Sequence, residues 1–169
     1  RDVSLKDDAE LAKIRGQTIG FVFQNFNLMM KRSIADNVSL PLVYQNVDEK
    51  ERYKRAVEML KRVNLEGYED RLPSQISGGM QQRVAIARAL INNPAIIFAD
   101  EPTGNLEYKT SDEIMVLFTS LNKQGITIVL VTHEDDVADY AKRMIKISDG
   151  HKVYDGARKE YSKEKETKC

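Results

Sequence analysis

Residues 95–102 read Ala-Ile-Ile-Phe-Ala-Asp-Glu-Pro, a short apolar run that ends in two adjacent acids and a proline. An unbroken apolar run of this kind is typical of a strand in a parallel sheet that is covered on both faces. Two carboxylates at a strand end are costly to bury unless they hold a cation or take up a proton, although many strands simply end in acids that face water. The stretch therefore predicts an α/β fold with a candidate site at Asp100 and Glu101.

Two more apolar runs lie on either side of this stretch, at residues 19–23 and 126–131, and a helical stripe of apolar residues precedes the second of them. Strands that alternate with helices predict a parallel sheet, and in such sheets ligands bind beyond the carboxyl ends of the strands. The side chains expected at this edge are Gln24, Asp100, Glu101 and His133.

The remaining elements follow from periodicity and from turn residues. Helices are predicted over residues 7–15, 33–46, 48–64 and 80–91. Gly16 is expected to end the first of them and Pro41 to interrupt the second, while Ser77 is a natural N-cap for the last. Asp149-Gly150 predicts a hairpin within residues 144–154.

Composition excludes several classes of protein. The 169 residues are 41% hydrophobic and 31% charged, which predicts one folded domain. Lys plus Arg and Asp plus Glu both number 26, so the net charge is zero and nucleic acid is not an expected partner. The single cysteine, Cys169, cannot form an intrachain disulfide. Nothing in this cysteine content calls for an oxidising compartment, so a cytoplasmic location is the default expectation. No apolar run reaches the roughly 20 residues that cross a bilayer, so the chain is not expected to cross a membrane unaided.

Each chemical motif is ambiguous when it is taken alone. The turn Ser77-Gly78-Gly79 leads into a helix, where backbone amides attract phosphate, but the same turn also serves as an ordinary helix cap. His133 can donate a hydrogen bond to a phosphate, or it can be a structural histidine. The order and spacing of all these features along one chain change the interpretation.

Five segments resemble, in order, the motifs of ABC-type ATPases. They are the Q-loop (Phe21–Gln24), the signature motif (Ile76–Arg83), the Walker B strand (Ala95–Pro102), the D-loop (Gly104–Glu107) and the switch-histidine loop (Val131–Glu134). The resemblance is greatest to the branch that includes macrolide exporters, lipoprotein-releasing systems and antimicrobial-peptide transporters.

This resemblance implies a P-loop NTPase-like parallel sheet with helices on both faces and an added α-helical subdomain. It covers residues 1–156, and the helical subdomain with the signature motif would span about residues 30–92. Residues 157–169 are expected to form a polar tail. The helical subdomain would dock a transmembrane permease, so that the chain works on the inner face of the cell membrane.

The same resemblance assigns roles in Mg²⁺-dependent ATP hydrolysis. Asp100 would hold Mg²⁺, Glu101 would act as general base, and His133 would contact the γ-phosphate. Gln24 would sense both Mg²⁺ and the γ-phosphate. A second nucleotide-binding subunit is implied, because the signature turn would bind a nucleotide held by the other copy. The residues of this turn are Ser77, Gly78, Gly79 and Gln81.

The chain departs from the family pattern in one large respect. The phosphate-binding string G-x-x-x-x-G-K-[ST], Walker A, does not occur, and the first glycine is Gly16. The early strands of the family are absent too, so this chain alone is expected to bind ATP weakly or not at all and not to hydrolyse it. Either the sequence is a fragment of a complete domain, or the gene is shortened and its product is a non-catalytic module. An ABC-type translation factor is a further alternative.

Overall fold

The computed structural model describes residues 6–161. The chain divides into two compact units, residues 1–129 and residues 130–169. The described helices include none that is long and apolar enough to cross a bilayer.

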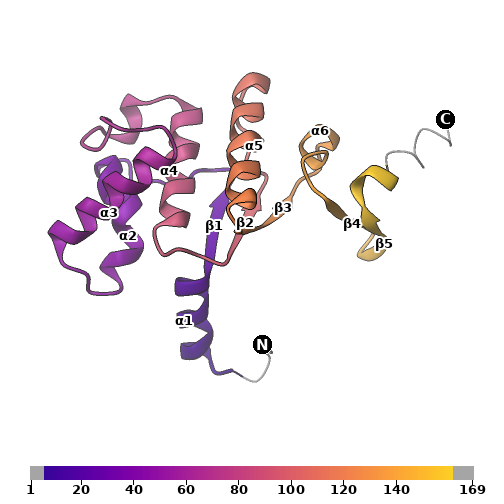
Figure 1. Ribbon diagram of the computed structural model, residues 1–169, viewed down its shortest axis with the longest axis horizontal. Coiled ribbons are helices and arrows are strands. Elements are labelled where there is room, and N and C mark those ends of the chain that lie inside the picture. Colours follow the sequence, from indigo (N-terminus) through magenta and orange to yellow (C-terminus); the bar gives the residue numbers. More distant parts are fainter. Residues whose placement is uncertain (1–5, 162–169) are drawn as a thin grey trace. The chain divides into compact units, whose positions relative to one another are not determined.

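Three strands form one sheet, in the order β1 (Ile19–Phe23), β2 (Ile96–Asp100) and β3 (Thr127–Val131). β1 and β2 run parallel, with Ile19 opposite Ile96 and Phe23 opposite Asp100. The two strands therefore end side by side (Figure 1). The predicted strand bounds are correct to within one residue, and the parallel pairing confirms the α/β class.

Burial alternates along β1 and β2, which their unbroken apolar runs did not predict. Val22, Ile97 and Ala99 are fully buried, whereas Phe21 and Phe98 are 41% and 37% exposed. The rings of Phe21 and Phe98 stack with their centroids 5.9 Å apart, so each ring shields part of the other on the exposed face of the sheet. The buried side of β1 packs against helix α4 (Gly78–Leu90).

A substitution at Gly20 tests how closely β1 and α4 pack. A Cβ at position 20 would lie 2.7 Å from the carbonyl oxygen of Ala89 and 3.0 Å from its Cβ. Because the strand and the helix would have to separate, we expect Gly20→Ala to lower the free energy of unfolding by about 1–3 kcal/mol, as measured by urea denaturation. Gly16→Ala is the control, since a Cβ there meets no atom within 4 Å. Equal midpoints for the two variants would contradict this packing.

The first two helices run past the residues that were expected to break them. α1 (Asp8–Thr18) continues through Gly16, which lacks the positive φ of a C-terminal glycine cap. α2 (Ile34–Val43) contains Pro41 without ending there, because Ile34 and Leu42 bury its apolar face on both sides of the proline. The predicted stop at Gly16 and the predicted interruption at Pro41 are therefore wrong.

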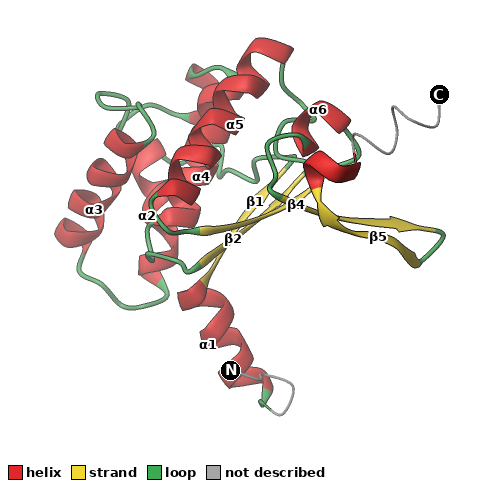
Figure 2. Ribbon diagram, turned by 45° about the vertical axis from the view of Figure 1, so that its right-hand side comes forward, coloured by secondary structure: helices red, strands yellow, loops and turns green. Residues whose placement is uncertain are grey.

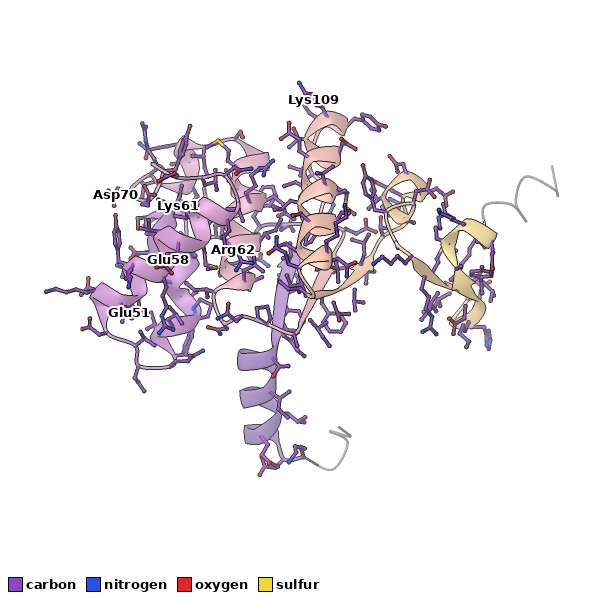
Figure 3. All side chains as sticks on the ribbon, in the orientation of Figure 1. Glu51, Glu58, Lys61, Arg62, Asp70 and Lys109 are labelled. Atoms are coloured by element: carbon purple, nitrogen blue, oxygen red, sulfur yellow. The ribbon has the colours of Figure 1, made fainter. Side chains whose placement is uncertain are left out.

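Helix α3 (Glu49–Arg62) is amphipathic, as predicted. The Asp48 side chain caps it by accepting a hydrogen bond from the Lys50 amide at 3.0 Å, and the buried residues Ala56 and Leu60 face the core. Figure 3 shows the charged side chains that this helix carries. Those labelled there are Glu51, Glu58, Lys61 and Arg62.

Helices α4 and α5 (Tyr108–Lys123) supply much of the core of the first unit (Figure 2). The predicted N-cap of α4 is confirmed, since the Ser77 hydroxyl oxygen accepts a hydrogen bond from the Met80 amide at 3.3 Å. The predicted apolar stripe of α5 is buried at Ile114, Phe118 and Leu121.

The second unit holds α6 (Asp135–Ala138) and an antiparallel hairpin of β4 (Arg143–Ser148) and β5 (His151–Ala157). Asp149 and Gly150 both have positive φ, 49° and 76°, as a tight hairpin turn requires. This confirms the predicted hairpin. Most of the predicted tail at 157–169, including Cys169, lies outside the described residues.

Candidate functional site

The ends of β1 and β2 bring two predicted site segments together. Because Phe23 pairs with Asp100, the next residues along each strand, Gln24 and Glu101, leave the sheet at the same edge. The Asp100 side chain is exposed there, and Glu101 is half-buried. A carboxylate and an amide side chain thus emerge from neighbouring strand ends.

Glu101 has an unusual backbone conformation. Its φ is +45°, a region that residues with a Cβ rarely adopt, and such conformations concentrate at functional sites. The surrounding turn holds it in place, since the Glu101 carbonyl accepts a hydrogen bond from the Gly104 amide at 3.1 Å. The buried Gln82 side chain of α4 donates to the Pro102 carbonyl at 2.6 Å. The position of the acid is therefore fixed by both its own turn and α4.

Gln24 is tied to the loop that follows Glu101. The Asn105 amide nitrogen donates to the Gln24 carbonyl at 3.1 Å, and the Gln24 side-chain nitrogen lies 3.5 Å from the Asn105 side-chain oxygen. The nitrogen of the Gln24 side-chain amide therefore faces Asn105. The oxygen of the same amide is the kind of atom that can coordinate a hard cation.

The signature turn meets both of these loops. A Cβ placed on Gly78 would lie 3.6 Å from Leu106 Cδ2 and 3.8 Å from Phe26 Cζ. A Cβ on Gly79 would overlap the Thr110 methyl group in the first turn of α5. Position 79 therefore has no room for a side chain, whereas a Cβ at position 78 would make ordinary van der Waals contacts with both loops. The amides of this helix terminus offer positive potential for an anion.

Gln81 occupies a different place from its neighbours in the signature motif. Its side-chain nitrogen donates to the carbonyls of Pro73 and Ile76, at 3.0 and 3.4 Å. These contacts hold the loop that leads into Ser77. They give Gln81 a supporting position behind the turn, and its role as a nucleotide ligand is still a prediction.

Arg88 holds the segment that follows Gln24, and sequence reasoning missed it. Its guanidinium donates to the carbonyls of Phe26 and Asn27, at 2.8 and 2.6 Å. Burial lowers the pKa of this guanidinium, because the charge loses its contact with water. The two carbonyls replace that water as hydrogen-bond acceptors. The available signal was an arginine in the Ala-rich second half of α4.

Asn37 is a second clamp that sequence reasoning missed. This fully buried residue of α2 accepts a hydrogen bond from the Met29 amide at 2.7 Å. Its side-chain nitrogen donates to the carbonyls of Met29, Arg32 and Ser33, at 3.1, 3.3 and 2.9 Å. A polar residue between the buried Ile34 and Val38 was the available signal.

His133 belongs to the second unit, where it follows β3 and is exposed. Its loop is structured by Thr132, whose hydroxyl oxygen accepts a hydrogen bond from the Glu134 amide at 3.1 Å. The next element, α6, is held by the buried Arg158, which pairs with Asp139 at 2.8 Å. His133 therefore lies two residues before α6, a helix that Arg158 holds in place.

Within residues 6–161, no cluster of three or more His, Cys, Asp or Glu side chains is arranged to hold a metal ion. Asp100 and the Gln24 amide oxygen offer only two donors, but both are hard oxygen atoms. Such a set fits Mg²⁺, which commonly takes one or two carboxylates and completes its shell with water and substrate phosphates. The donors present therefore suit a metal that arrives with a phosphate ligand.

Comparison with known sequences points to one family. The sequence profile described as "ABC transporter" matches residues 2–104. The chain is 49% identical over 152 residues to YknY of Bacillus subtilis (strain 168), described as an uncharacterized ABC transporter ATP-binding protein. It is 52% identical over 155 residues to MacB of Chlorobaculum tepidum, described as a macrolide export ATP-binding/permease protein. These matches cover 90% and 92% of this chain, but 66% of YknY and 24% of MacB.

Comparison with solved structures agrees. The ATP-binding cassette MJ0796, in a dimeric post-hydrolysis state bound to ADP and Pi, superposes with a TM-score of 0.78 at 48% identity. That match covers 90% of this chain and 68% of the cassette. The cbiO1 subunit of the Clostridium perfringens transporter complex cbiONQ gives a TM-score of 0.84 at 33% identity, over 95% of this chain and 65% of cbiO1.

Proposed function

Since this chain belongs to the ABC transporter family, we propose that it supplies the Q-loop, signature and Walker B segments of an ATP-hydrolysing subunit that drives export or extraction. The observation that carries this proposal is the meeting of three loops in the first unit. Phe26, two residues after the Q-loop, and Leu106 of the D-loop both approach Gly78 of the signature turn. The ATP-binding relatives and the ADP-bound neighbour support the same conclusion.

In this proposal, hydrolysis takes place beyond the ends of β1 and β2. Asp100 and the Gln24 amide oxygen would hold Mg²⁺, which supplies charge neutralisation for the phosphates. Glu101 would orient the attacking water and accept its proton. The fixed turn around Glu101 keeps this carboxylate in one position, which serves a reaction that depends on alignment.

The signature turn would act on a nucleotide that a second copy holds. Ser77 is exposed and caps the 13-residue helix α4. Together with Gly78 and Gly79, it would offer donors and the positive helix end to a γ-phosphate. The dimeric state of the MJ0796 cassette supports this arrangement. His133 would contact the γ-phosphate when the nucleotide is bound.

A permease is the proposed membrane partner. The MacB relative is described as an ATP-binding/permease protein, so in that protein the two functions share one chain. We expect the helical region at about residues 30–92 to dock the permease, on the cytoplasmic face of the membrane. Co-purification of the permease with a protein that contains this chain tests this partner.

The absence of a phosphate-binding string predicts that the 169-residue chain alone does not hydrolyse ATP. Without that lysine and its amide cradle, the phosphates lose most of their charge compensation. The measurement is Mg²⁺-dependent phosphate release by the purified chain. The comparison is a completed cassette, in which the chain is joined at its N-terminus to the segment of YknY that precedes the matched region.

We expect turnover by the completed cassette and none above background by the chain alone. Equal turnover by both would contradict the predicted inactivity of the chain. A completed cassette that is folded but binds no ATP would contradict the proposed function itself.

A further inference from the structure

Asn105 joins two loops that are far apart in the sequence. Its side-chain nitrogen donates to the Gln24 carbonyl and to the Asn25 side-chain oxygen, both at 3.1 Å. Its side-chain oxygen lies 3.5 Å from the Gln24 side-chain nitrogen, 81 positions away along the chain. One amide therefore contacts both the backbone and the side chain of Gln24, the residue that follows β1.

Gly104 brings the same two loops into close contact by a second route. A Cβ at position 104 would lie 2.7 Å from the Gln24 side-chain nitrogen and 3.2 Å from its Cδ. Any larger residue at position 104 would push the Gln24 amide away from where it lies. Gly104 thus leaves room for the same amide group that Asn105 contacts.

The rest of the loop after β1 is held independently of Asn105. Arg88 binds the carbonyls of Phe26 and Asn27, and Asn37 binds both the amide and the carbonyl of Met29. These clamps attach the loop to helices α4 and α2. Loss of the Asn105 side chain would therefore free Gln24 without releasing the whole loop.

The Asn105 contacts are exposed, and exposed hydrogen bonds add little to stability because water replaces them. Their consequence is geometric: they set the orientation of Gln24 relative to the turn that carries Glu101. We propose that Asn105 is a positioning residue that fixes Gln24 against the Walker B turn, so that the Mg²⁺ ligand and the catalytic base keep one relative geometry. This inference rests on the proposed function.

A double-mutant cycle in the completed cassette tests the inference. We expect Asn105→Ala to lower kcat for ATP hydrolysis about tenfold and to leave KM within about twofold, since one tenfold step is a typical size for such a coupling. The double variant Gln24→Ala, Asn105→Ala should be no slower than Gln24→Ala alone. Gly104→Ala should reproduce the kcat loss of Asn105→Ala with little change in thermal stability.

Asn92→Ala is the matched control, because the Asn92 amide also donates to a distant backbone carbonyl, that of Gly16 at 2.6 Å. This variant should keep the parental kcat. Independent, multiplying effects of Gln24→Ala and Asn105→Ala would overturn the inference. So would an unchanged kcat in Asn105→Ala.

A second readout does not depend on ATP hydrolysis. Hydrogen exchange in the 169-residue chain should become faster at residues 24–26 in Asn105→Ala, and stay unchanged over residues 29–33, which Asn37 holds. If exchange at residues 24–26 does not change, the contact does not restrain Gln24 and the inference fails. Inactivity of the completed cassette with altered exchange would instead locate the failure in the proposed function.

Discussion

Replacing Glu101 with glutamine should reduce ATP turnover by the completed cassette about 10²–10⁴-fold, the range that a positioned general base contributes. The substitution keeps the size and shape of the side chain, but it replaces one carboxylate oxygen with an NH2 donor and removes the capacity to accept a proton. The positive φ of Glu101 belongs to the turn, so the glutamine should occupy the same position. ATP binding should be retained.

Two measurements check this expectation, namely steady-state phosphate release and equilibrium binding of ATP. Glu58→Gln is a suitable control, because it makes the same chemical change at an exposed position on α3. A Glu101→Gln cassette that hydrolyses ATP at the parental rate would show that another group is the base. Loss of ATP binding would show that the glutamate acts in binding rather than in proton transfer.

The largest stability effect is expected at Asn37. Asn37→Leu keeps the approximate size of the side chain but removes the partner of the Met29 amide and of the Arg32 carbonyl. The Met29 and Ser33 carbonyls keep hydrogen bonds from the backbone amides of Arg32 and residue 37. Unsatisfied groups in a partly buried place cost about 1–3 kcal/mol each when water cannot reach them. Because some of these groups will regain water, we expect a net loss of about 2–4 kcal/mol in the free energy of unfolding, measured in urea.

Ser39→Ala provides the comparison on the same helix. The Ser39 hydroxyl also makes a hydrogen bond from a buried side chain, but only to the local carbonyl of Asp36 at 3.3 Å. Its removal should cost less than about 1 kcal/mol. If Asn37→Leu were as stable as Ser39→Ala, the loop from Met29 to Ser33 would not depend on the Asn37 clamp.

The local sequence pattern was sufficient to predict several parts of this fold. The unbroken apolar runs located β1 and β2, and the Ser77 cap and the Asp149-Gly150 turn follow from rules that involve only a few neighbouring residues. The polar residue after each strand was expected at one sheet edge, and the register of β1 with β2 places Gln24 beside Glu101. Such features depend on chain periodicity and on short-range hydrogen bonds.

Tertiary contacts decided what the sequence did not reveal. Pro41 continues a helix because residues on both sides of it are buried, and the alternating burial of β1 depends on which face α4 covers. Asn37, Arg88 and Asn105 bind backbone groups on other elements, so no periodic pattern identifies them. Their roles appear only when the loops are brought together in space.

The central claim is that two copies of this chain's signature and Walker B segments enclose shared nucleotides. The most direct test is the molar mass of the Glu101→Gln completed cassette, measured by light scattering with and without ATP. We expect a monomer without ATP, a dimer with ATP, and loss of that dimer when Ser77 is also changed to arginine. A cassette that binds ATP and stays monomeric would contradict the central claim.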